Sequence, residues 1–118
     1  QNYMWLRGNA SCVFAENSNT SFNMPLNLLG YSRMIIGPNA YVEMASGGIC
    51  GNQVIVDISQ GTIFAFSGGR MSMRATCKVQ GEGDLLVAGG AHDMSFSIDS
   101  KITYHCFHYF FQFRGVWA

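Results

Sequence analysis

Apolar and polar residues alternate in short stretches along the middle of the chain. A period of two predicts β-strands that bury one face. Each stretch is followed by a glycine-containing turn and a second short strand, which we expect at residues 62–66 and 84–87. The apolar positions of the three stretches are Val54, Val56 and Ile58, then Met73, Ala75, Cys77 and Val79, then Met94, Phe96 and Ile98.

Pairs of glycines recur between these strands at a constant interval of about 21 residues, a period typical of solenoid proteins. The pairs are Gly47–Gly48, Gly68–Gly69 and Gly89–Gly90. Rows of this length place apolar residues in common columns, for example Val56 above Cys77 above Ile98. We interpret the glycine pairs as turn residues, because tight corners need positive φ or close backbone approach.

The fold predicted from this pattern is all-β, a parallel β-helix with coils of about 21 residues. The coils are expected over residues 28–103, after a polar N-terminal arm or cap at 1–27 and before an aromatic C-terminal strand or docking segment at 104–118. A β-sandwich or jelly roll stays open as the alternative, since its turns also carry glycine at regular spacing.

The glycine pairs and apolar columns of residues 28–103 resemble the right-handed parallel β-helix repeats of bacterial and protist surface proteins and extracellular fibres. The resemblance implies a fold and a structural role. Pectin-degrading enzymes share that fold but are much longer, and no basic residue is grouped with the acidic residues in matching columns here. Asp57 and Lys78 are expected in one column as an outward-facing pair.

Charged residues make up only 12% of the chain, and seven basic residues balance seven acidic ones. A neutral chain lacks the field that steers nucleic acids or anionic membranes. No apolar run reaches the ~18 residues of a membrane span, so we expect no transmembrane segment. The first residue is Gln1, which we interpret as the sign of a removed signal peptide or of further upstream sequence.

Cysteines and sequons favour a secreted protein at the cell surface or in the extracellular space. The four cysteines Cys12, Cys50, Cys77 and Cys106 could form disulfides, and their count leaves three pairings open. They contain no clustered pair, so a zinc site is not expected. The sequons at Asn9 and Asn19 are candidate N-glycosylation sites.

The sequence contains few groups of neighbouring residues that could bind a metal ion or a phosphate, or act in catalysis. His105, Cys106 and His108 lie close in sequence, but on a strand they do not share one face, so we expect packing and no metal site. The Gly-rich turns precede no helix with a following lysine, which argues against a phosphate site. We therefore predict no catalytic residues, no cofactor and no enzymatic activity.

Aromatic residues gather near both ends of the chain and form the expected docking surface. They are Trp5, Phe107, Tyr109, Phe111, Phe113 and Trp117. Apolar ends on a solenoid predict continuation into adjoining segments of a longer chain or into copies of itself. We expect a self-assembling structural subunit or segment of a fibre, appendage or surface layer. The alternatives are a carbohydrate-binding or adhesion module using Tyr3, Trp5, Tyr41 or Trp117, and a glycan-cleaving enzyme.

Overall fold

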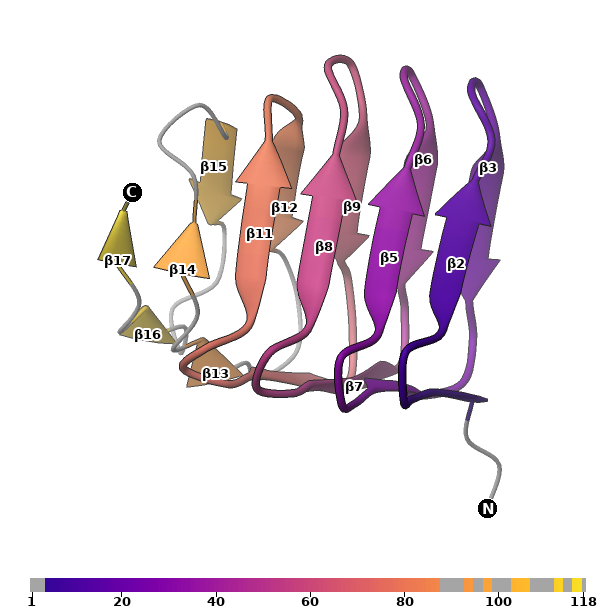
Figure 1. Cartoon of the computed structure of the whole chain (residues 1–118). Helices are drawn as coiled ribbons and strands as arrows, with labels where there is room; N and C mark the ends of the chain where they lie inside the picture. The colour runs from indigo at the N-terminus through magenta and orange to yellow at the C-terminus, as the bar shows by residue number, and fades with distance from the viewer. Residues whose placement is uncertain are drawn as a thin grey trace.

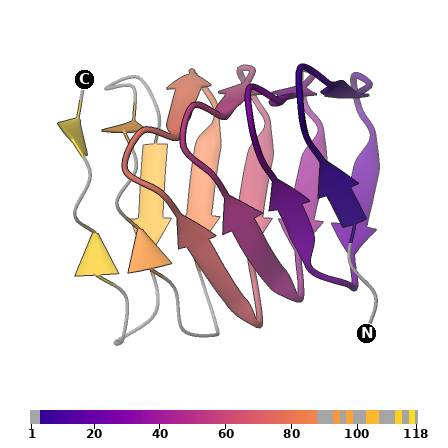
Figure 2. The ribbon, with the colours of Figure 1, turned by 60° about the horizontal axis from the view of Figure 1, so that its bottom comes forward.

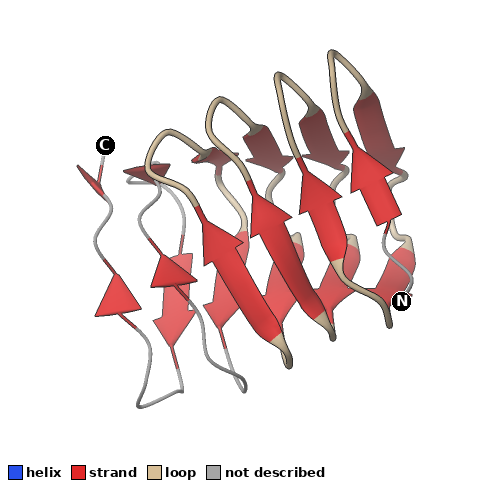
Figure 3. Cartoon of the chain, turned by 90° about the horizontal axis from the view of Figure 1, so that it is seen from below, coloured by secondary structure: helices blue, strands red, loops and turns tan. Residues whose placement is uncertain are grey.

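The chain folds as a parallel β-solenoid. The computed structural model describes residues 4–87 throughout and, beyond them, the backbone of five short strands between residues 93 and 117. All regular structure in this described part is β-strand (Figure 3). Successive coils lie side by side along one axis and make about four turns (Figure 1). The all-β parallel β-helix prediction is confirmed, and the sandwich alternative is wrong because every strand pairing in the described part is parallel.

Three parallel sheets, named A, B and C, form the sides of each coil (Figure 2). Sheet A contains β1 (Met4–Leu6), β4 (Leu26–Leu28), β7 (Gly47–Cys50), β10 (Arg70–Met73), β13 (Asp93–Met94) and β16 (Gln112–Phe113). Sheet B contains β2 (Ser11–Phe14), β5 (Arg33–Ile36), β8 (Ile55–Ile58), β11 (Lys78–Gly81), β14 (Ser97–Ile98) and β17 (Val116–Trp117). Sheet C contains β3 (Asn19–Phe22), β6 (Tyr41–Met44), β9 (Ile63–Phe66), β12 (Asp84–Val87) and β15 (Thr103–Cys106).

The coil length is about 22 residues and varies along the chain. Met4 pairs with Leu26 and Leu26 with Gly48, so the first coils keep one constant spacing. The next coil departs from this spacing at two corners, of which one is longer and the other shorter. The corner between β9 and β10 is one residue longer than the preceding corners of that kind, and the corner between β11 and β12 is two residues shorter. The constant interval of the glycine pairs therefore does not describe the register.

Stacked apolar columns fill the interior. In sheet B, Val56 pairs with Val79, so the expected column of Val56 above Cys77 is wrong by two residues. In sheet C, Val42, Phe64 and Leu85 stack in one column, and all three are fully buried. Each buried side chain of this kind contributes about 1.5–3 kcal/mol of transfer free energy. The described core is therefore a continuous apolar filling between the three sheets.

The corners between sheets B and C repeat one turn geometry. Asn17, Asn39 and Gly61 have φ values of 64°, 59° and 80°, and they lie at equivalent places in successive coils. Each occupies the third position of a four-residue turn closed by a backbone hydrogen bond, such as the 3.1 Å bond from Thr62 N–H to the Ser59 carbonyl. Asparagine and glycine tolerate the left-handed conformation better than other residues. These corners set the true period of the solenoid.

The first coil begins within the segment expected to be a polar arm or cap. Strands β1, β2 and β3 pair in register with the second coil in all three sheets. At the other end, β15, β16 and β17 continue the ladders through part of the segment expected to be an aromatic docking strand. The solenoid thus extends beyond residues 28–103 in both directions.

Candidate functional site

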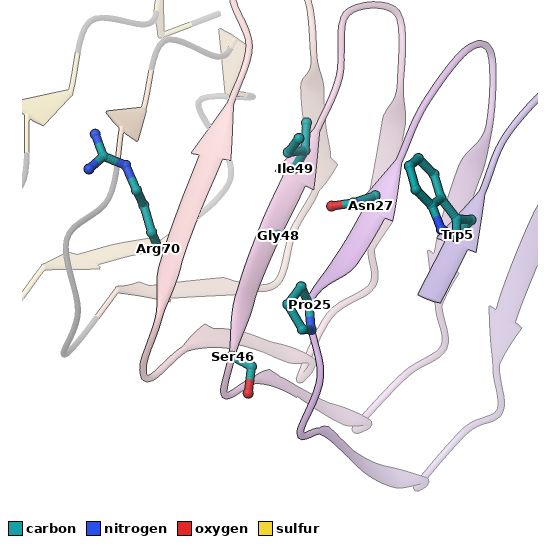
Figure 4. A pocket seen from close by; sticks show the side chains of 7 residues that line it. All are labelled: Trp5, Pro25, Asn27, Ser46, Gly48, Ile49 and Arg70. Atoms are coloured by element: carbon teal, nitrogen blue, oxygen red, sulfur yellow. The ribbon is translucent and has the colours of Figure 1, made fainter. Parts of the chain in front are cut away.

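A groove of about 480 Å³ crosses the outer face of sheet A (Figure 4). It runs across four neighbouring strands, β1, β4, β7 and β10. With strands about 4.8 Å apart, the groove spans roughly 14 Å from β1 to β10. Its lining consists of Trp5, Pro25, Asn27, Ser46, Gly48, Ile49 and Arg70. The lining therefore combines an aromatic ring, aliphatic surface and a few polar groups, which is the usual composition of a ligand site.

Glycine is required at positions 47 and 48, beside the groove, because a side chain at either would collide with the backbone of a neighbouring strand. Gly47 pairs with Arg70 in the register, and a Cβ atom on Gly47 would lie 2.2 Å from the Arg70 carbonyl oxygen. Its φ of +73° is also unfavourable for other residues. On Gly48, a Cβ atom would lie 1.9 Å from the Leu26 carbonyl oxygen. Only glycine fits at these two positions, so the surface between Pro25 and Arg70 stays low.

Asn27 lies in the middle of the groove between Trp5 and Ile49, its register partners on the two adjacent strands. Its side chain extends from β4 toward β7 (Figure 4), and only 5% of the residue is exposed. No other described residue forms a hydrogen bond with its side-chain amide. The amide reaches the surface of the groove, since Ser32 Oγ is the one fully buried side-chain polar atom without a partner among the described residues.

An arginine lies near each end of the groove. Arg70 is exposed on β10 and forms no ion pair with another described residue. At the opposite end, the Arg7 guanidinium lies 5.6 Å from the centroid of the Trp5 ring, a cation–π arrangement. No carboxylate belongs to the lining formed by the described residues. The groove can thus attract a negatively charged group, and none of its own residues neutralises that charge.

The outer face of sheet B differs, because its polar groups bind one another. Asp57 accepts hydrogen bonds from Arg33 on the preceding coil and from Gln80 on the following coil. Asp57 pairs with Gln80 in the register, so the expected column of Asp57 and Lys78 is wrong. Lys78 lies instead beside Ile55. The shift has the same cause as in the core, a coil that is longer at this point than the interval of the glycine pairs.

A second apolar feature lies at the start of the solenoid, where β1, β2 and β3 form the first edge of their sheets. A small hollow of about 70 Å³ opens between the first and second coils. Its lining is almost entirely apolar and comprises Met4, Trp5, Leu6, Cys12, Phe22, Leu26, Leu28 and Met34. Trp5 is 53% exposed and Val13, on the outer face of β2, is 67% exposed. Apolar side chains thus lie open at the edge where another coil could stack.

The predicted turn glycines do not occupy equivalent places. Gly68 and Gly69 lie in the turn before β10, whereas Gly47 and Gly48 are the first two residues of β7. Gly89 and Gly90 lie outside the described residues, as do Phe107, Tyr109 and Phe111. Phe113 and Trp117 lie on β16 and β17, where only the backbone is described. Of the predicted docking residues, Trp5 is the one whose side chain the structure places.

The predicted glycosylation sites are exposed, whereas the described cysteines of the predicted disulfides are partly or fully buried. Asn9 and Asn19 are exposed, in a turn and at the start of β3. No disulfide joins Cys12, Cys50 and Cys77 to one another, and Cys106 lies on β15, where only the backbone is described. Burial and the neighbouring Cys77 thiol raise the pKa of Cys50 well above its ordinary value. The pairing of the four cysteines stays a prediction.

Two further findings limit the chemistry of the described residues. Within them, no three His, Cys, Asp or Glu side chains form a group that could hold a metal ion. Nor does this part of the chain contain a helix with the length and hydrophobicity that crossing a membrane requires.

The groove residues Pro25, Asn27, Ile49 and Arg70 were not predicted from the sequence. They come from three different coils and become neighbours only when the rows follow the strand register and not the interval of the glycine pairs. The corner residues Asn17, Asn39 and Gly61 carry the signal that gives this register. The chain matches no protein-family model, and comparisons with curated proteins and with solved structures return no match.

Proposed function

We propose that this chain is an extracellular structural protein, a self-assembling subunit or segment of a fibre, appendage or surface layer. The observation that carries the proposal is the open apolar edge of the first coil. Exposed Trp5 and Val13 flank it, and the hollow beside them is lined by core residues of the first two coils. An apolar edge of this kind is stabilised when another coil covers it.

Backbone groups at this edge support pairing with another strand. The carbonyls of Ala10 and Phe14 accept hydrogen bonds from the second coil. Because backbone groups alternate in direction along a strand, those of Ser11 and Val13 point away from that coil. They have no strand partner within the described residues, since β2 is the first strand of sheet B. The partner we propose is a copy of the chain or an adjoining segment of a longer chain, stacked in the same direction.

An extracellular location agrees with the sparse charge and with two exposed sequons at Asn9 and Asn19. The carbohydrate-binding alternative has its own support in the groove over sheet A. A glycan-cleaving enzyme has less support, because such enzymes need a pair of carboxyl groups beside the bound sugar and none of the described residues lining the groove supplies one.

Sedimentation velocity over a range of concentrations, with negative-stain electron microscopy, tests the assembly proposal. We expect rods or larger oligomers that grow with concentration. Val13→Lys places a charge on the outer face of the edge strand without entering the core, and it should shift the distribution toward monomer.

Tyr31→Lys is the matched control, because Tyr31 is 65% exposed but belongs to the second coil. This control should assemble like the original chain. A monodisperse monomer at every concentration would overturn the proposal, and so would equal loss of assembly in both lysine variants.

A further inference from the structure

The side chain of Asn27 lies at the centre of the groove and has no partner among the described residues. Several polar groups elsewhere on the outer faces have partners across coils. Ser67 donates to Glu43, and the Thr76 hydroxyl donates to the Asn52 side-chain oxygen at 3.0 Å. Asn27 is equally able to bridge coils, yet its register neighbours are Trp5 and Ile49, which offer no side-chain acceptor. The amide therefore keeps its donors and its acceptor available to a ligand in the groove.

The groove around Asn27 cannot recruit a peptide by strand addition. Strands β4 and β7 are internal strands of sheet A, and each already pairs on both sides. A ligand here must therefore be recognised by side chains and not by backbone ladders. An amide, a hydroxyl and a guanidinium beside an aromatic ring suit a molecule with many hydroxyl groups and an apolar ring face. Saccharides have both.

Charge narrows the class of saccharide further. Arg70 lies at one end of the groove without an ionic partner in the described part of the chain, and no lining residue described there is acidic. Guanidinium groups bind carboxylates with two parallel hydrogen bonds. The groove crosses four strands, so it is long enough for more than one sugar unit.

We propose that the groove over sheet A binds an acidic saccharide chain, with Trp5 against a sugar ring, Asn27 bonded to ring hydroxyls and Arg70 paired with a carboxylate. Gly48 adds no side chain to the lining beside Asn27. The site shares Trp5 with the edge proposed for assembly, whereas Arg70 belongs only to the groove and Val13 only to the edge, so variants of these two residues test the two proposals independently.

Isothermal titration calorimetry of the full chain with hexagalacturonate tests the proposal, with a neutral glucose hexamer as the comparison ligand. We expect hexagalacturonate to bind and the neutral hexamer to bind at least about 10-fold more weakly, in line with the loss of one charge-assisted hydrogen bond. Arg70→Gln should weaken hexagalacturonate binding by a similar factor. Asn27→Leu should weaken the binding of both oligosaccharides, because it removes the amide and keeps a similar shape.

Arg74→Gln is the matched control. Arg74 is also exposed and follows β10, but it does not line the groove. Its removal should change the affinity less than twofold. The proposal is overturned if hexagalacturonate does not bind, if the neutral hexamer binds equally well, or if Arg74→Gln weakens binding as much as Arg70→Gln. Circular dichroism on each variant checks that the fold is retained, and sedimentation of Arg70→Gln separates loss of ligand binding from loss of assembly.

Discussion

The outer faces of sheets A and B belong to the same coils, but they differ in whether their polar side chains bind one another. On sheet B, Arg33, Asp57 and Gln80 form a ladder across three coils, and each has a partner within the chain. On sheet A, Asn27 and Arg70 have no such partner among the described residues, and glycines hold the surface open between them.

This difference separates a surface that stabilises the solenoid from one that does not. A ladder of paired groups on an exposed face contributes modestly to stability and leaves little capacity for a ligand. A hollow whose central amide has no partner among the described residues adds no such stabilisation, and it leaves that amide available to a ligand. Substitutions on the two faces should therefore change stability in different directions.

The largest effect is expected from Gly47→Ala, at the start of β7 in sheet A. The new Cβ would meet the Arg70 carbonyl oxygen, and the φ of +73° adds strain. We expect the free energy of unfolding to fall by about 3 kcal/mol or more, measured by urea denaturation.

Gly8→Ala provides the control for Gly47→Ala. Gly8 has a nearly identical φ of +70°, but nothing lies within 4 Å of its Cβ position. This variant should lose only the backbone term, about 1–2 kcal/mol. Equal losses at the two sites would contradict a steric conflict between a Cβ at position 47 and the Arg70 backbone.

Two substitutions of intermediate effect, one on each face, should change the free energy of unfolding in opposite directions. Asn27→Leu removes an unpaired amide and should raise the free energy of unfolding by about 1 kcal/mol. Asp57→Leu removes the central acceptor of the sheet B ladder and should lower it by about 1 kcal/mol or less, because Arg33 is well exposed to solvent. Thermal and urea unfolding of both variants measure the difference. A loss of stability in Asn27→Leu would contradict the contrast between the faces.

The smallest expected effect concerns Cys50, whose buried thiol lies in the interior beneath both faces. It is absent near neutral pH and develops only at high pH. The pKa of Cys50 is raised by burial, with a further contribution from Cys77. Above the ordinary thiol pKa of 9.0, the unfolded chain loses a proton that the folded chain retains. The free energy of unfolding should therefore be constant below that pH and decrease as the pH rises above it.

Urea denaturation from neutral pH to well above the ordinary thiol pKa measures this dependence. The Cys50→Ala variant should be less stable at all pH values, since it leaves a cavity, but it should lose part of the decrease at high pH. An identical pH dependence in the two proteins would contradict a buried, protonated thiol at Cys50.

Much of the fold was predictable from residues 54–87. Their alternation places Val56, Ile58 and Val79 on buried strand faces, and all three are buried. The register was not predictable from the glycine pairs. Gly47–Gly48 and Gly68–Gly69 keep the constant interval of the pairs, but the register pairs Gly47 with Arg70 and Gly48 with Met71, so the second glycine pair lies two places before the equivalents of the first. Asn17, Asn39 and Gly61 mark the corners better, but two residue types share that role.

The groove was less predictable than the fold. Trp5 was expected to be exposed, and it is. Asn27 looked like an ordinary residue of a polar segment, because nothing local shows that Trp5 and Ile49 will flank it. The distance in sequence between these three residues is a full coil on each side, and an error of one residue in the period moves a side chain to the opposite face.

The sequence by itself determined that this chain forms short β-strands with one apolar face and repeats them in coils of nearly constant length. The reason is local: side-chain alternation and turn residues act within a few positions of one another. Only the tertiary structure decided which residues become neighbours across coils. That depends on the length of every corner, because parallel pairing fixes the register of each strand on the one before it. The outer column Trp5, Asn27 and Ile49, and with it the proposed saccharide site, exists only as a consequence of that register.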